Sequence, residues 1–128
     1  MNEQCLGIDW GTVRIGLSLG NAETKIASPL GVVGSLDALL DMAKSEKIDR
    51  LVVGNPLHSH GTARPENKAF TAFVEALEAR SGLPLTLIDE RFSSQSADKL
   101  GAGTKRDGER DAIAAMIILQ TYFDNLPK

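Results

Sequence analysis

Residues 5–20 read CLGIDWGTVRIGLSLG, and the predicted fold depends on this stretch more than on any other. It opens with a short apolar run that ends in a carboxylate, Asp9. Gly11 and Thr12 suit a tight turn, and after them apolar residues alternate with polar or small ones at the period of a β-strand. Residues 4–20 are therefore predicted to form a β-hairpin.

Beyond this hairpin, the sequence changes to alternating helix and strand patterns. A third strand is expected over Lys25–Val33, where Pro29 favours an edge position or a bulge. The elements expected after it are a helix from Leu36 capped by Ser35, a buried strand over Arg50–Gly54, a helix over Pro65–Arg80, a strand over Leu85–Ile88, a short helix from Ser93 or Ser94 to Gly101, a basic loop over Gly101–Arg110, and a last helix after Asp111. Strands joined through a helix should lie parallel, which predicts an α/β fold with a mixed sheet flanked by helices.

Composition places the chain among ordinary globular proteins, and one domain over residues 1–128 is the simplest expectation. The last helix is apolar on nearly every side, so we expect it to pack against the sheet, against a second copy in a homodimer, or both. No apolar run approaches the ~20 residues that span a bilayer, and the N-terminus lacks a signal-peptide pattern. The single cysteine, Cys5, excludes an internal disulfide. These features predict a cytoplasmic protein that does not bind membranes.

Three carboxylates stand where a globular chain would not casually place them: Asp9 inside an apolar strand, Glu90 at a strand end, and Asp111 before the most apolar helix. They can converge if the strands that carry Asp9 and Glu90 are neighbours and the last helix packs across them. Such a cluster, without cysteine or paired histidines, is a hard-oxygen site suited to Mg²⁺ or Mn²⁺. Two metals roughly 4 Å apart would serve phosphodiester hydrolysis.

Each carboxylate also has a structural interpretation. Asp9 could be a buried acceptor for backbone N–H groups, Asp111 could cap its helix, and Glu90 could pair with Arg91. For Cys5 and Trp10, packing is the expected role, and the His58–His60 spacing is expected to be incidental. Only the combination of the three acids indicates a metal site.

Four segments, GIDWGTVRIG (7–16), VVGNPL (52–57), LIDERFSS (87–94) and DAIAAMIILQTYF (111–123), follow the order and spacing of the YqgF/RuvX family of Holliday junction resolvases. The resemblance covers essentially the whole chain. It implies an RNase H-like fold with a five-stranded mixed sheet and a divalent-metal triad of Asp9, Glu90 and Asp111. One loop departs from the usual N-M-D-G-T, since His58-Ser59-His60-Gly61-Thr62 stands here, which leaves substrate handling in this loop open.

The family resemblance implies nuclease functions of two kinds: maturation of precursor small-subunit ribosomal RNA, which we favour, and resolution of branched DNA. A binding module without catalysis is a further alternative, and three adjacent acids count against it because they would repel phosphates. Residues 9–16 are also similar to the phosphate-binding hairpin of the actin and sugar-kinase ATPases. Those enzymes need two such lobes, and this chain has the length of one, so an ATPase would require two chains.

The segment from Arg91 to Arg110 carries five basic residues against three acidic ones. Because lysine, arginine and serine side chains hold phosphate backbones, the residues expected to bind substrate are Arg14, Arg91, Ser94, Lys105 and Arg106. The alternative is an ordinary solvated loop.

Changing Lys105 and Arg106 together to Ala should weaken nucleic-acid binding and flatten its dependence on salt, because fewer counterions are then released. Binding titrations at several salt concentrations measure the slope. An unchanged slope would mean that substrate docks elsewhere.

Overall fold

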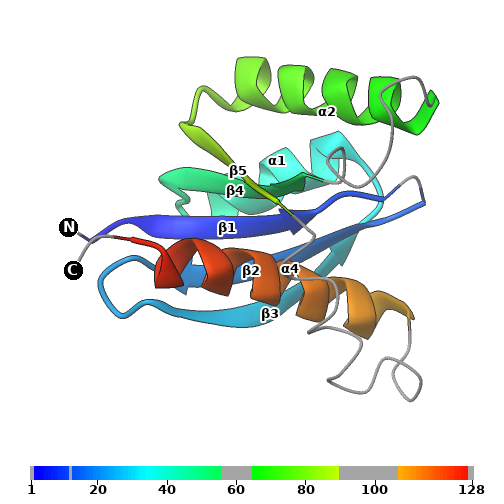
Figure 1. Ribbon diagram of the computed structural model, residues 1–128. Coiled ribbons are helices and arrows are strands. Elements are labelled where there is room, and N and C mark those ends of the chain that lie inside the picture. Colours follow the sequence, from blue (N-terminus) through cyan, green and yellow to red (C-terminus); the bar gives the residue numbers. More distant parts are fainter. Residues whose placement is uncertain (1, 12, 56–64, 90–106, 127–128) are drawn as a thin grey trace.

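The computed structural model describes residues 2–11, 13–55, 65–89 and 107–126, in which five strands form one mixed sheet (Figure 1). The strand order is β3-β2-β1-β4-β5. The strands are β1 (Gln4–Asp9), β2 (Ile15–Asn21), β3 (Ile26–Val33), β4 (Arg50–Asn55) and β5 (Leu85–Asp89). β2 pairs antiparallel with β1 and β3, whereas β1, β4 and β5 run parallel. The predicted five-stranded α/β fold and its opening hairpin are confirmed.

β3 is an edge strand and also carries a bulge, so both of the alternatives that Pro29 suggested are found. Leu17 of β2 pairs with Gly31, but the next residue, Ser18, pairs with Pro29. Leu30 is therefore the extra residue of the bulge. Proline is tolerated here because an edge strand leaves one side of its backbone without a ladder partner.

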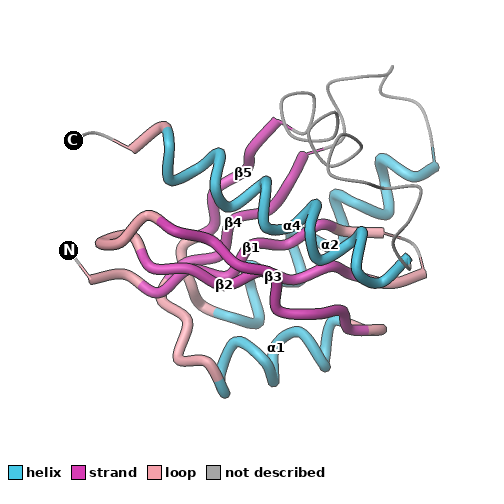
Figure 2. The backbone as a smooth tube through the Cα atoms, turned by 90° about the horizontal axis from the view of Figure 1, so that it is seen from below, coloured by secondary structure: helices cyan, strands magenta, loops and turns pink. Residues whose placement is uncertain are grey.

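In the described part of the chain, three helices cover the two faces of the sheet. They are α1 (Leu36–Ser45), α2 (Pro65–Ser81) and α4 (Asp107–Asp124). Ser35 caps α1, its side chain accepting from the Ala38 N–H at 3.2 Å, as predicted. Figure 2 separates α1 on one side of the sheet from α4 on the other. No described helix is long and apolar enough to cross a membrane.

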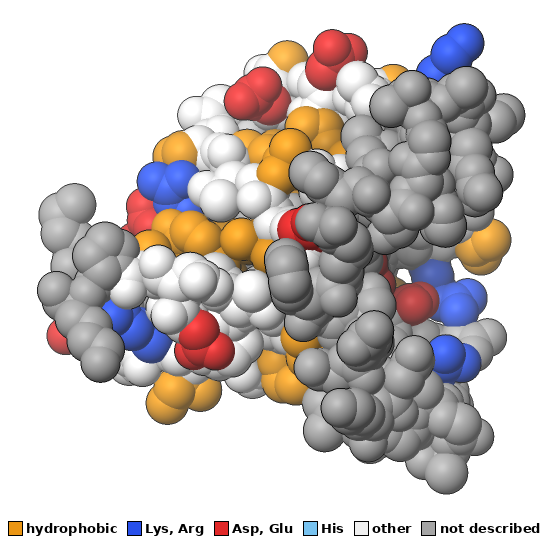
Figure 3. All heavy atoms as spheres, viewed as in Figure 1, with side chains coloured by type: hydrophobic (Ala, Val, Ile, Leu, Met, Phe, Trp, Pro, Cys, Tyr) orange, Lys and Arg blue, Asp and Glu red, His pale blue; other side chains and the backbone are white. Residues whose placement is uncertain are grey.

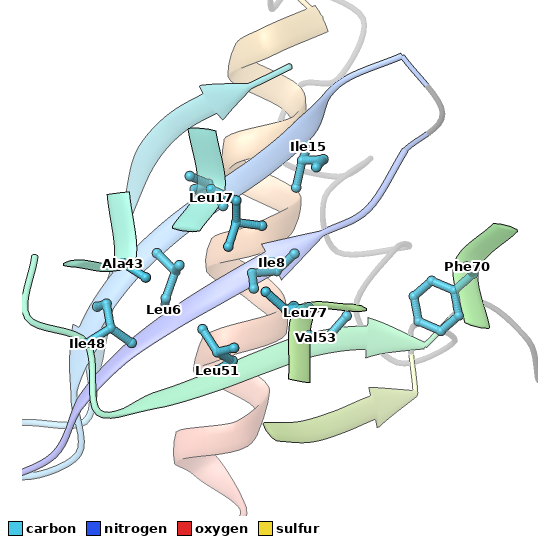
Figure 4. Close-up of a cluster of buried hydrophobic side chains, with 11 residues drawn as sticks. Leu6, Ile8, Ile15, Leu17, Ala43, Ile48, Leu51, Val53, Phe70 and Leu77 are labelled. Atoms are coloured by element: carbon cyan, nitrogen blue, oxygen red, sulfur yellow. The ribbon is translucent and has the colours of Figure 1, made fainter. Parts of the chain in front are cut away.

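Side chains from alternate strand positions build the core under α1 and α2. Figure 4 shows Leu6 and Ile8 of β1 pointing toward the same cluster as Val53 of β4 and Leu77 of α2. Trp10 packs against this core, with its ring centroid 5.7 Å from that of Phe70 and the two ring planes inclined at 63°. The predicted packing role of Trp10 is therefore confirmed.

On the opposite face, residues with little or no side chain allow α4 to lie very close to the sheet. A Cβ on Gly7 would lie 2.1 Å from Ser18 Oγ and 2.7 Å from the Ala115 carbonyl oxygen. Ser18, which pairs with Gly7 across the β1–β2 ladder, donates its hydroxyl to that same carbonyl at 2.7 Å. Further along, a Cβ on Gly20 would lie 2.6 Å from the ring of Phe123. The helix backbone thus rests directly on two strands.

One expectation about this region is wrong. α4 begins at Asp107, so residues 107–110 are helical instead of forming the end of a basic loop. Acidic residues favour a first helical turn, which explains the earlier start. The adjacency of the strands before Asp9 and Glu90, stated above as a condition for convergence, is not met, because β4 lies between β1 and β5. The short helix expected over residues 93–101 lies outside the described residues.

Substituting Gly7→Ala should destabilise the protein by about 1–3 kcal/mol, since the added methyl meets helix backbone that cannot rotate away. Gly34→Ala is the matched control, because nothing lies within 4 Å of a Cβ at that position. Urea unfolding curves of the two variants test this comparison, and equal stability would argue against close packing of α4 on β1.

Candidate active site at the carboxyl end of the first strand

The carboxyl ends of the three parallel strands lie at one edge of the sheet, on the right in Figure 1. β1 ends there at Asp9, and β4 and β5 end there with the paired residues Asn55 and Asp89. Asp9, Asn55 and Asp89 all make interactions within the structure. Parallel α/β sheets commonly bind ligands outside the carboxyl ends of their strands, so this edge is where a site is expected.

Asp9 and Asp111 both lie next to a single glycine, Gly16, at this edge: Asp9 stands beside it on the neighbouring strand and Asp111 lies above it on α4. Asp9 pairs with Gly16 across the β1–β2 ladder. A Cβ on Gly16 would lie 2.1 Å from the Asp111 carbonyl oxygen and 2.9 Å from Asp111 Cβ. Since Gly7 contacts α4 and strand side chains alternate, Asp9 lies on the face that α4 covers. The two aspartates thus share one face of the sheet next to Gly16, and the convergence of all three acids on one metal site stays a prediction.

Arg14, in the connection between β1 and β2, forms an ion pair with Asp111 through its Nε atom. The two side chains are only 35% and 29% exposed, so solvent screens this pair less than an ordinary surface pair. The guanidinium group offsets part of the negative charge that the two aspartates gather at this edge. It also ties the hairpin to the second turn of α4.

Asp111 does not cap its helix, because α4 starts four residues earlier at Asp107. This removes the structural alternative that the sequence left open for Asp111. Asp9 is partly buried and makes an interaction within the structure. Glu90, Arg91, Ser94, Lys105 and Arg106, together with His58 and His60, lie outside the described residues.

Among the residues that the structure describes, no three acidic, histidine or cysteine side chains form a group suited to a metal ion. Glu90 does not belong to the described residues. Cys5 is fully buried, and this burial raises the pKa of its thiol to about 12. At neutral pH it is therefore a small apolar side chain, as predicted, and not a nucleophile. Across the face in Figure 3, described acidic and basic side chains are interspersed.

The residue that sequence reasoning missed is Gly16. A glycine in a strand often marks close approach of another backbone, and here Gly16 begins an alternation of small residues that continues with Ser18 and Gly20. The sequence shows this alternation of small residues, but it does not show that α4 packs against them.

Replacing Arg14 by Gln should lower the free energy of unfolding by about 1 kcal/mol, because it leaves the half-buried Asp111 carboxylate without its cation. Arg80→Gln is the control, since the Arg80–Asp37 pair is 52% and 77% exposed and should contribute less than about 0.5 kcal/mol. Chemical denaturation measures both. An equal effect at the two positions would contradict a special role for the Arg14 pair.

Comparison with known proteins places this arrangement in a family. A family model described as "RuvX: Holliday junction resolvase" matches residues 3–125. A protein of Paraburkholderia phymatum named "Putative pre-16S rRNA nuclease" is 40% identical, over 94% of this chain and 85% of its own length. A protein of the same name from Cupriavidus taiwanensis is 38% identical, over 95% of this chain and 89% of its own length.

Solved structures share the fold at low sequence identity. Thermus thermophilus RuvC, determined in complex with a Holliday junction substrate, is 15% identical with a TM-score of 0.60, over 94% of this chain and 93% of that one. The fowlpox virus resolvase is 12% identical with a TM-score of 0.59, over 98% and 99%. These likenesses confirm the expected RNase H-like fold, and the match over residues 3–125 shows that the chain belongs to the RuvX family of Holliday junction resolvases.

Proposed function

We propose that the chain is a divalent-metal-dependent nuclease, acting as one domain, with Asp9, Glu90 and Asp111 as metal ligands. The observation that supports this proposal is that Asp9 pairs with Gly16 across the β1–β2 ladder and Asp111 of α4 lies directly over the same glycine, at the carboxyl edge of the sheet. A strand end and a helix far apart in the sequence bring two acids together there. Such a placement is costly unless a cation is held between them.

The donor set fits a hard cation. Asp9 and Asp111 offer carboxylate oxygens, which Mg²⁺ and Mn²⁺ prefer, and the described chain brings no thiolate or imidazole to this edge. Glu90 directly follows Asp89, the last residue of β5, and is proposed as the third ligand on the strength of the family resemblance. Arg14 partly neutralises the acids in the absence of a metal and would compete with one for Asp111.

When bound, the metal would supply a hydroxide nucleophile and stabilise charge on the leaving oxygen of a phosphodiester. The chain's own residues hold and position it. Asp9 lies at the end of a central strand, and Asp111 lies on a helix that packs closely on the sheet. The backbone positions of both residues are therefore held by their neighbours. Once Asp111 binds the metal, Arg14 would be released to contact the phosphate. Further phosphate contacts are proposed for Arg91, Ser94, Lys105 and Arg106.

The favoured substrate is a precursor of small-subunit ribosomal RNA, because curated relatives about 40% identical carry that name. This substrate would place the protein in the cytoplasm. Branched DNA is the second candidate, favoured by the description of the family model. Incubating the protein with labelled precursor rRNA and with a DNA four-way junction, each with Mg²⁺, Mn²⁺ or EDTA, separates the two. Cleavage of neither with either metal would refute the nuclease proposal.

Asp9→Asn should reduce the cleavage rate more than 100-fold, because even residues that only support a metal ligand typically contribute 10–100-fold. Removing one of the clustered charges should leave thermal stability in EDTA equal or higher. Mg²⁺ should raise the melting temperature of the unsubstituted protein but not of the variant, since ligands stabilise only what binds them.

Asp41→Asn, an exposed carboxylate on α1, is the control and should match the unsubstituted protein in both measurements. A structural role for Asp9 predicts the opposite pattern. The Asn variant would then melt lower in EDTA, by an amount equivalent to roughly 1–3 kcal/mol, and still cleave at a near-normal rate.

A further inference from the structure

A groove of about 330 Å³ opens between the β3 edge and the first turns of α4. Its lining comes from Pro29, Leu30, Gly31 and Val32 on the strand and from Glu109, Ala112 and Ile113 on the helix. All seven residues belong to the described part of the chain. None of the proposed metal ligands is among them, so the groove is separate from the carboxylate pair.

The groove lies directly beside the candidate active site. Asp9 pairs with Gly16, and Gly16 in turn pairs with Val32, so the three residues form one row across β1, β2 and β3. Two strand spacings, about 10 Å, separate the backbones of Asp9 and Val32. On the helix side, Asp111 is followed immediately by Ala112, which lines the groove.

The bulge in β3 accounts for the opening. At its other end β3 is held to α4, because Gln120 accepts from the Ala27 N–H at 3.0 Å and donates to the Lys25 carbonyl at 2.9 Å. After Ala27, the extra residue Leu30 changes the register and bends the strand. Bulges beside active sites commonly redirect a strand in this way.

The chemistry of the described lining residues does not favour a phosphate group as the occupant. Neither lysine nor arginine is among them, and the charged residue in this set is an acid, Glu109. The remaining lining residues are apolar or glycine, and Val32 stays 41% exposed although it is large and apolar. An occupant with a flat apolar face and hydrogen-bond donors at its edge fits this combination, and a nucleobase has both.

We propose that this groove receives an unstacked nucleobase of the substrate strand, close to the phosphate cleaved at Asp9 and Asp111. This inference rests on the proposed nuclease function. The base lies against Val32 and Ala112, and the Glu109 carboxylate accepts from amino or ring N–H groups at the edge of the base. The phosphate backbone stays outside the groove, toward Arg14.

The test uses a 5′-labelled RNA oligonucleotide that spans the mapped cleavage site, with one abasic nucleotide moved through each position around that site. Affinity is measured by fluorescence anisotropy in EDTA, and cleavage is measured separately with metal. Removal of the base at one position should weaken binding about tenfold, while neighbouring positions change little. A four-way DNA junction with the same scan replaces the RNA if only DNA is cleaved.

Val32→Glu should abolish this positional effect. The added carboxylate would keep the base out of the groove, so oligonucleotides with and without a base at the sensitive position should then bind equally well. Ile26→Glu is the matched control, since Ile26 is 68% exposed on the same edge strand but outside the groove, and it should retain the effect. Val32→Thr, which keeps the shape and strand preference of valine, should reduce the effect and guards against misfolding of the first variant.

The outcomes separate this inference from the function on which it rests. If the protein cleaves RNA but no abasic position is sensitive, or if neither Val32 variant changes the sensitive position, the nucleobase site is refuted and the proposed nuclease function is not. Absence of both binding and cleavage would overturn the two together. A sensitive position that disappears in Val32→Glu and persists in Ile26→Glu supports the nucleobase site.

Discussion

The packing of α4 on the glycine-rich face of β1 and β2 is the contact on which the rest of the structure depends. Gly7, Gly16 and Gly20 all lie where a Cβ would come within 3 Å of α4 atoms, and Ser18 hydrogen-bonds to the helix backbone between them. A helix normally packs on a sheet through side chains that keep the two backbones apart. On the face of β2 that meets α4 the residues are Gly16, Ser18 and Gly20, so the helix backbone itself becomes part of the interface.

This contact joins the fold to the candidate site. At one end of the interface Phe123 lies over Gly20 and belongs to the apolar core, whereas at the other end Asp111 lies over Gly16 beside Asp9. The same rigid interface thus stabilises the fold and positions a carboxylate. At this polar end of the interface, the ion pair between Arg14 and Asp111 joins the β1–β2 hairpin to α4. The groove beside Val32 opens where β3 leaves this tightly packed region.

Local patterns predicted most of the individual elements. The Ser35 cap, the edge or bulge position of Pro29 and the packing of Trp10 were all readable, because each depends on a few neighbouring residues or on burial of a large apolar surface. The start of α4 was placed too late, since the apolar run begins only after Asp111 and the preceding turn is polar. Amphipathic patterns report buried faces, and Glu109 and Arg110 before the apolar run are exposed.

The sequence by itself determined the fold class, the position of Asp9 inside an apolar strand and of Asp111 just before an apolar helical run, and the alternation of small residues over 16–20. It did not determine the strand order, because hydrophobic patterns show which strands are buried but not which are neighbours; β4 lies between β1 and β5. Only the tertiary structure decided that Asp111 rests on Gly16 opposite Asp9. That approach depends on how closely a helix can sit above a sheet, which is set by packing between residues far apart in the chain.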